Sequence, residues 1–142
     1  MFQGTSLVSL DVKGRLSLPV RYREGLMLTC QGEVTITRHP DRCVLIFPRA
    51  VWIALKAKLM KLPYSARVLR RILIGSAVDV KADGSGRLLI PNELRCLCGL
   101  TREVALMGLG DHFELWDQAA LAEFETKELA KDFSETLEDF VL

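Results

Sequence analysis

An internal duplication is the feature that most limits how this chain can fold. The segment SLDVKGRLSLP at residues 9–19 reappears as KADGSGRLLIP at residues 81–91. The offset of 72 residues aligns Val8 with Val80, Asp11 with Asp83, Gly14 with Gly86, Arg15 with Arg87, Leu16 with Leu88 and Pro19 with Pro91. Two copies of roughly 50 residues are too few for a solenoid, and they suit a unit in which each copy covers the apolar face of the other.

Each copy is predicted to contain two strands, a short helix and two more strands. Apolar and polar residues alternate on both sides of DVKG and DGSG, which is typical of half-buried strands joined by a hairpin turn. Pro19 and Pro91 suit the first turn of a helix that ends near Gly25 or Gly99. The second strand pairs are expected at 33–38 with 43–47 and at 103–108 with 112–116.

Helical periodicity follows each copy. Apolar residues recur at helical spacing from about residue 49 to residue 74, with a break at Pro63 and Ser65. Asp117 is expected to cap a further helix over residues 118–131. The patterns therefore predict a mostly β protein with flanking α-helices. Its parts are a first repeat at 1–51, linking helices at 52–75, a second repeat at 76–120, and a C-terminal helix with an acidic tail at 121–142.

Charge is divided unequally along the chain, although the net charge is only +1. Residues 1–75 contain 13 Lys and Arg against 4 Asp and Glu, whereas residues 76–142 contain 6 against 14. Such asymmetry indicates a polyanionic partner for the first half, or contacts between basic and acidic halves of neighbouring subunits. For the basic face of the linking helices we favour solvent or a subunit contact over DNA. That face comprises Lys56, Lys58, Lys61, Arg67, Arg70 and Arg71.

The sequence offers little for catalysis, a cofactor or a metal. No Gly-rich phosphate loop or hydrolase motif is present, and His39 and His112 are expected in turns or on the surface. The four cysteines fit no zinc pattern and are expected to be reduced and buried. No apolar run reaches the roughly 20 residues of a membrane span, and the N-terminus does not resemble a signal peptide, so we expect an unexported, cytoplasmic protein.

The motif Asp-x-x-x-Arg stands at matching places in the two copies, as Asp11 with Arg15 and as Asp83 with Arg87. In one interpretation each Asp caps its own hairpin turn and each Arg pairs with that Asp. In the other, the same pairing stiffens a tip that presents Arg, together with Lys13, to a phosphate or a base edge. The residues alone leave both interpretations open.

Three segments resemble the MraZ family of bacterial transcriptional regulators: GTSLVSLDVKGRLSLPVRYREGL at 4–26, DGSGRLLIPNELR at 83–95 and FELWD at 113–117. The resemblance extends from the first residues to about residue 121. It implies two domains similar to those of AbrB regulators, whose swapped hairpins interleave into one small pseudo-twofold barrel. It also implies a ring-shaped oligomer that represses transcription by binding short tandem repeats in double-stranded DNA near the division and cell-wall gene cluster.

The resemblance implies a set of site residues as well. The expected DNA contacts are Arg15, Lys13, Arg87 and Lys81, and the expected turn-structuring residues are Asp11, Gly14, Asp83 and Gly86. Ser85 stands where the first copy has Lys13, so the second tip is less basic. We expect no cofactor, metal, membrane or small-molecule substrate, and a location at the nucleoid. The alternative is an antitoxin-like interaction module whose acidic helical end wraps a second protein, with DNA binding secondary.

Overall fold

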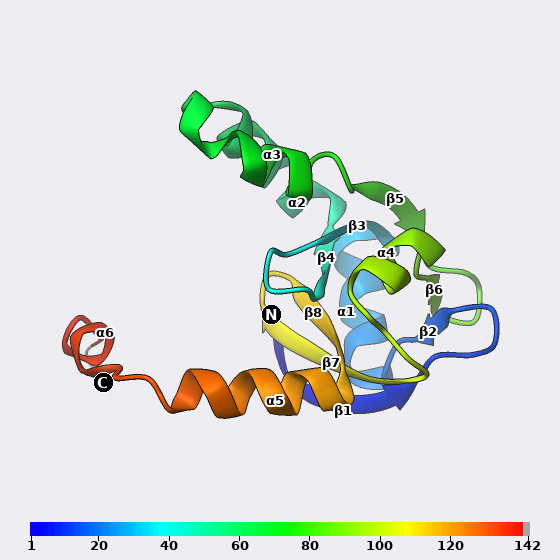
Figure 1. The fold of residues 1–142 in the computed structure, drawn as a ribbon. Coiled ribbons are helices and arrows are strands. Elements are labelled where there is room, and N and C mark those ends of the chain that lie inside the picture. The colour runs from blue at the N-terminus through cyan, green and yellow to red at the C-terminus, as the bar shows by residue number, and fades with distance from the viewer. Residues whose placement is uncertain (141–142) are drawn as a thin grey trace.

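The computed structural model describes residues 1–140, and both repeats show the predicted order of two strands, a helix and two strands (Figure 1). The first repeat contains β1 (Phe2–Ser9), β2 (Arg15–Ser17), α1 (Val20–Cys30), β3 (Glu33–Arg38) and β4 (Val44–Pro48). The second contains β5 (Val78–Lys81), β6 (Arg87–Leu89), α4 (Asn92–Leu97), β7 (Glu103–Gly110) and β8 (Phe113–Asp117).

Helices connect and follow the repeats. The linking segment contains α2 (Arg49–Met60), a short 3-10 helix η1 (Tyr64–Ala66) and α3 (Arg67–Leu73). The break predicted at Pro63 and Ser65 is confirmed, since neither residue belongs to an α-helix. The chain continues with α5 (Gln118–Leu129) and α6 (Ser134–Glu138). As predicted, Asp117 caps α5, because its side chain accepts a hydrogen bond from the Ala120 backbone N–H at 3.1 Å. Figure 1 shows α2 and α3 at one end of the molecule and α5 extending from the other.

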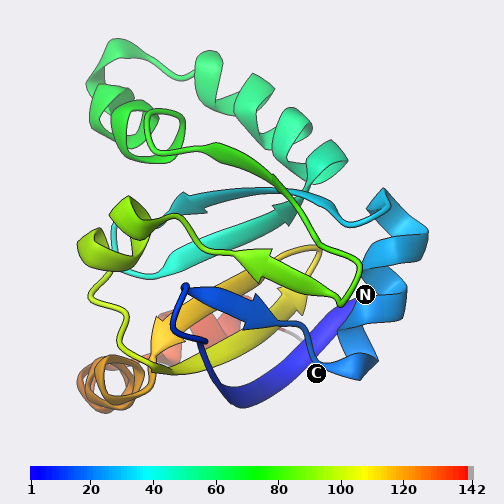
Figure 2. The ribbon, with the colours of Figure 1, turned by 90° about the vertical axis from the view of Figure 1, so that its right-hand side faces the viewer.

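The two repeats exchange strands. The main sheet has the order β1-β7-β8-β4-β3-β5, so β1 of the first repeat pairs with β7 of the second, and β5 of the second pairs with β3 of the first. All of these pairings are antiparallel. Strands β2 and β6 form a separate two-stranded ribbon, and Figure 2 shows these two strands side by side. Neither repeat therefore completes its sheet without the other.

Two parts of the expected fold class need correction. Within residues 1–140 no closed barrel forms, because β1 and β5 are the edges of the six-stranded sheet and the β2–β6 ribbon is a sheet of its own. The protein is also mixed α/β and not mostly β, since its helices contain more of the described residues than its strands do. The closed barrel was implied by the family resemblance, and sequence periodicity gives no check on it, because it marks strands without showing which of them pair.

The core lies between the ribbon, α1 and the main sheet. Leu16 of β2 and Leu88 of β6 are directly paired and fully buried, and Phe113 packs beneath them with Phe2 and Tyr22. Burying each such side chain stabilises the fold by roughly 1.5–3 kcal/mol. Because the buried cluster takes residues from both repeats, the core fixes the ribbon to the sheet.

A second apolar cluster lies under α2, α3 and α5. It contains Trp52 of α2 and Trp116 of β8. The centroids of the Trp116 ring and of the Phe124 ring in α5 are 4.9 Å apart. This contact fixes the first half of α5 to the sheet. The expectation of buried cysteines holds for Cys43 and Cys98 but is wrong for Cys96, which is exposed at the surface of α4.

Candidate nucleic-acid interface

Asp11 organises the first hairpin turn. One carboxylate oxygen accepts hydrogen bonds from the backbone N–H groups of Lys13 and Arg15, both at 2.9 Å, and the other accepts from Arg15 Nε at 2.6 Å. Gly14 closes the turn with φ of 80°, a conformation that L side chains rarely adopt. The pKa of the Asp11 carboxyl lies below its usual range. The hydrogen bond from the Arg15 backbone N–H is the largest cause, and the Arg15 side chain adds to it, while desolvation acts in the opposite direction.

The second turn repeats this arrangement. Asp83 accepts from the backbone N–H groups of Ser85 and Arg87 at 2.9 Å, and from Arg87 Nε at 2.8 Å. Gly86 has φ of 73°. The pKa of the Asp83 carboxyl is lowered by the same contacts, with the Arg87 backbone N–H as the largest cause. The two motifs are therefore structurally equivalent at their turns.

The ribbon places the two motif arginines on one face. Arg15 is paired with Leu89, and Ser17 is paired with Arg87, so Arg15 and Arg87 are diagonal neighbours across the ribbon. Because side chains alternate along a strand, these four residues share the face opposite the buried Leu16 and Leu88. Diagonal neighbours in an antiparallel pair are separated by about 7–8 Å. The two guanidinium groups thus belong to one surface, which we call the ribbon face (Arg15, Ser17, Arg87 and Leu89).

Both arginines keep their outer nitrogens free among the described residues. In each case Nε donates to the motif Asp, and neither Nη1 nor Nη2 has a hydrogen-bond partner within residues 1–140. The side chains are only partly exposed, at 28% for Arg15 and 33% for Arg87. Each guanidinium is therefore held in one orientation, with its two terminal nitrogens available to a partner.

The two candidate lysines lie in different settings. Lys13 is exposed in the first turn, beside the ribbon face, where Ser85 stands in the second turn. Lys81 is exposed at the end of β5, where it is paired with Glu33 of β3 on the main sheet. The structure therefore brings Arg15, Arg87 and Lys13 to one ribbon and places Lys81 on the other sheet.

Two further arginines that sequence reasoning missed lie against the turns. Arg95 of α4 lies over Gly14 of the opposite repeat, and Arg23 of α1 lies over Gly86. Arg95 Nε donates to the Ile90 carbonyl at 3.1 Å, and Arg23 Nη2 donates to the Leu18 carbonyl at 3.0 Å. The offset of 72 that relates the repeats also relates Arg23 to Arg95, so the signal was present in the sequence.

The other chemistry-bearing residues form no catalytic or metal centre in the described part of the chain. His112 stacks on Phe47 and its Nδ1 lies 2.8 Å from Asp111 Oδ1 in a turn, and His39 lies in the turn before β4. Within residues 1–140 no group of three or more His, Cys, Asp or Glu side chains is arranged to hold a metal ion. In the same residues, no helix combines the length and apolar character needed to cross a membrane.

Comparison with known proteins gives a consistent result. The family model described as "MraZ protein, putative antitoxin-like" matches the chain twice, over residues 1–75 and 73–142. Proteins named "Transcriptional regulator MraZ" from Herminiimonas arsenicoxydans and Bordetella pertussis are each 51% identical to it over 140 residues, which is 99% of either sequence. The protein of that name from Paraburkholderia xenovorans is 49% identical over the same length and coverage.

Proposed function

The chain belongs to the MraZ family of transcriptional regulators, which are not enzymes, and from this premise we propose that it represses transcription by binding DNA through its β2–β6 ribbon. The DNA target is a set of short tandem repeats upstream of the division and cell-wall gene cluster. The active form is a ring-shaped homo-oligomer in which each subunit presents one ribbon. The two repeats are AbrB-like domains, and the protein acts at the nucleoid in the cytoplasm.

The single observation that carries this proposal is the presence of Arg15 and Arg87 on one ribbon face. The major groove of B-DNA is wide enough to admit a two-stranded β-ribbon. An arginine recognises guanine by donating from two nitrogens to O6 and N7, which is worth roughly 1–3 kcal/mol of discrimination. Each motif arginine has two unpartnered Nη groups among the described residues, so each is chemically equipped for one guanine.

The motif aspartates contribute by ordering these side chains in advance. A free arginine loses rotamer freedom when it binds, whereas Arg15 and Arg87 are already held through Nε by Asp11 and Asp83. The ion pairs also neutralise part of the positive charge of the ribbon. The ribbon is therefore better suited to base edges than to non-specific attraction, and Lys13 supplies a phosphate contact beside it. Lys81 is the more distant candidate for a backbone contact.

A single ribbon is expected to bind DNA weakly. It neutralises few phosphates, so one subunit on one site approaches the non-specific range of about 10⁻⁴ to 10⁻⁶ M. A ring that presents several ribbons to several repeats gains affinity through effective concentration, provided that the repeat spacing fits the ribbon spacing. Tandem sites are thus a physical requirement of the proposal.

A mobility-shift assay against the region upstream of the gene tests this function. DNA with one, two, three and four repeats is compared with shuffled DNA of the same length and composition. We expect affinity to rise steeply with repeat number and to stay low for shuffled DNA. Equal affinity for one repeat and for four would contradict the ring, and equal affinity for both kinds of DNA would contradict sequence-specific binding.

A second candidate function is an antitoxin-like module, because the matching family is described as antitoxin-like. Its supporting observation is the C-terminal segment, which exposes Phe133, Leu137 and Phe140 among acidic residues. Co-purification with the product of a neighbouring toxin-like gene favours this candidate. Absence of any such complex, with specific DNA binding intact, counts against it.

A further inference from the structure

The C-terminal segment of the chain projects from the body. Helix α5 contacts the sheet through its first half, where Leu121 and Phe124 join the second apolar cluster. Every residue from 129 to 140 is exposed, and Figure 1 shows α6 apart from the rest of the molecule. We call residues 125–140 the acidic arm.

The acidic arm combines negative charge with a row of exposed apolar side chains. It contains six Asp and Glu against two Lys. Both lysines already pair with a glutamate, Lys127 with Glu123 just before the arm and Lys131 with Glu128 within it. Phe133, Leu137 and Phe140 follow each other at intervals of four and three residues, so they share one side of α6 and its flanks. That spacing is typical of an amphipathic helix that binds a groove on a protein.

The linking helices offer the complementary surface, which we call the basic hairpin (residues 49–73). Residues 42–78 contain no Asp or Glu, and the six cations of its outer face form no ion pair within residues 1–140. The hairpin also exposes large apolar side chains. The most exposed of these are Ile53, Met60, Tyr64 and Val68.

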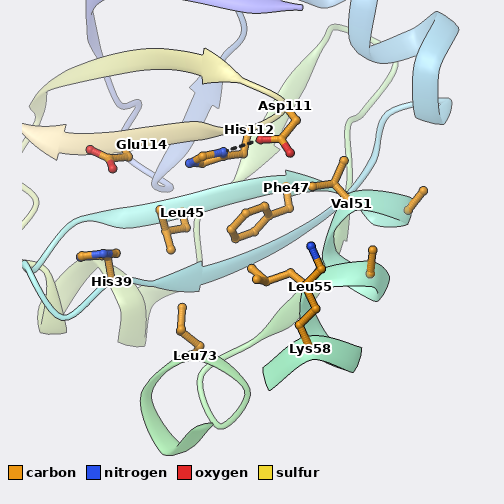
Figure 3. Close-up of a pocket in the computed structure, with 12 residues that line it drawn as sticks. His39, Leu45, Phe47, Val51, Leu55, Lys58, Leu73, Asp111, His112 and Glu114 are labelled. Atoms are coloured by element: carbon orange, nitrogen blue, oxygen red, sulfur yellow. Dashed lines mark hydrogen bonds and ion pairs between the residues drawn. The ribbon is translucent and has the colours of Figure 1, made fainter. Parts of the chain in front are cut away.

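An apolar groove lies beside the basic hairpin. Its volume is about 660 Å³, and it lies between α2, α3 and strands β4 and β8. Figure 3 shows Leu45, Phe47, Leu55 and Leu73 lining it, with Lys58 on α2 at the same groove. A groove of this size accommodates an aromatic or leucine side chain. Asp111 and Glu114 line it together with Lys58, so the groove itself offers apolar contacts, and the attraction for an acidic segment comes from the cations of the basic hairpin beside it.

We propose that the acidic arm of one copy docks on the basic hairpin of a second copy and inserts Phe133 and Leu137 into this groove. Figure 1 shows the arm and the hairpin of one chain as separate projections, so the contact forms between chains. The charges of the two surfaces are opposite, and both expose apolar side chains that gain by burial. This inference rests on the ring proposed above and assigns the contact that links neighbouring subunits.

The contact is heterologous, since the arm of the second copy stays free to bind a third. Repetition of such a contact gives a closed ring or an open filament, depending on the rotation between copies. The ribbon face takes no part in it. Assembly and single-site DNA recognition are therefore separable by substitution.

Two full-length variants test the contact. The arm variant is Phe133→Ala with Leu137→Ala, and the hairpin variant is Lys58→Glu with Lys61→Glu and Arg71→Glu. Each alone is expected to lose the oligomer and to sediment with the mass of one chain, 15.9 kDa, in analytical ultracentrifugation. An equimolar mixture is expected to form dimers and nothing larger, because only one intact arm and one intact hairpin remain in each pair.

The matched control is Val20→Ala with Leu28→Ala, which removes two apolar side chains of α1 that are exposed to a similar extent as each other. It is expected to keep the wild-type mass, and circular dichroism checks that every variant is folded. Oligomers of unchanged mass in the arm variant, or a mixture that stays monomeric, would overturn the docking. An arm variant that keeps its mass but loses a co-purified protein would assign the arm to that partner instead.

Failure of the docking is distinguishable from failure of the proposed function. If the arm variant has the same oligomer mass as the wild type and still prefers tandem repeats, the proposed ring is supported and only the docking is wrong. If the wild-type protein is itself a monomer, both the ring and the docking are wrong. Binding of either variant to DNA with one repeat is expected to match that of the wild type within about twofold, since the ribbon is intact.

Discussion

The guanidinium of Arg95 lies against Gly14 across the boundary between the two repeats. A Cβ atom at Gly14 would come within 2.3 Å of Arg95 Cζ, and the equivalent atom at Gly86 would come within 2.4 Å of Arg23 Nε. Each repeat therefore uses a helix arginine to hold the hairpin turn of the other. This reciprocal contact fixes the two turns relative to each other and so defines the ribbon face.

Replacing Gly14 by Ala is expected to destabilise the protein. The substitution forces a side chain into a turn with φ of 80° and displaces Arg95, at a cost of roughly 1–3 kcal/mol for the strained backbone. Gly84→Ala is the matched control, because open space surrounds Gly84 and its φ lies outside the left-handed region. Urea unfolding measures both free energies of unfolding. Equal stability of the two variants would mean that Gly14 is not constrained.

The turns are expected to lose order only in acid. The folded-state pKa values of Asp11 and Asp83 are lowered, so their stabilising contribution is complete above the unfolded value of about 3.9 and disappears as pH falls through the lower folded value. The amide NMR signals of Gly14 and Gly86 report this change. Asp11→Asn is expected to abolish the transition at Gly14 and leave that at Gly86. A transition near neutral pH would contradict the assignment.

Lys13→Ala is expected to weaken binding to every DNA sequence alike. We propose that Lys13, in the turn beside the ribbon face, contacts a phosphate, so its loss reduces the slope of log K against log salt by about 0.9 for each subunit engaged on the DNA. The preference for repeat DNA over shuffled DNA stays unchanged. Titrations at four salt concentrations with both DNAs measure slope and preference together. A selective loss for repeat DNA would assign Lys13 to a base edge.

Ser85→Lys is expected to strengthen binding to every DNA sequence alike. It gives the second turn the lysine that only the first turn has, at a position that is exposed and structurally equivalent. Binding to repeat and shuffled DNA should tighten equally, with the slope of log K against log salt increased by about 0.9 for each subunit engaged on the DNA. Ser17→Lys on the ribbon face serves as a contrast, since there a long side chain interferes with base contacts. No gain from Ser85→Lys would mean that the second turn does not approach the backbone.

The sequence predicted what is local or repeated. Alternation of apolar and polar residues located the strands, and Asp11 with Gly14 identified the turn, because the bonds involved join neighbours in the chain. The pairing of β2 with β6 joins residues 70 to 74 positions apart, and periodicity does not specify the partner or register of a strand. The shared face of Arg15 and Arg87 was therefore visible only in the structure. The closed barrel implied by the resemblance also depends on which strands pair, and within residues 1–140 it does not form.

Recognition of DNA by the ribbon face is measured by the specificity ratio of the arginine variants. The ratio of affinities for four-repeat DNA and shuffled DNA is measured at one salt concentration for the wild type, Arg15→Ala and Arg87→Ala, with oligomer mass and folding checked in parallel. We expect each variant to keep its assembly and lose roughly 1–3 kcal/mol of discrimination per recognised base, so that the ratio falls towards one. An unchanged ratio in both variants, with the oligomer intact, would contradict recognition by the ribbon face.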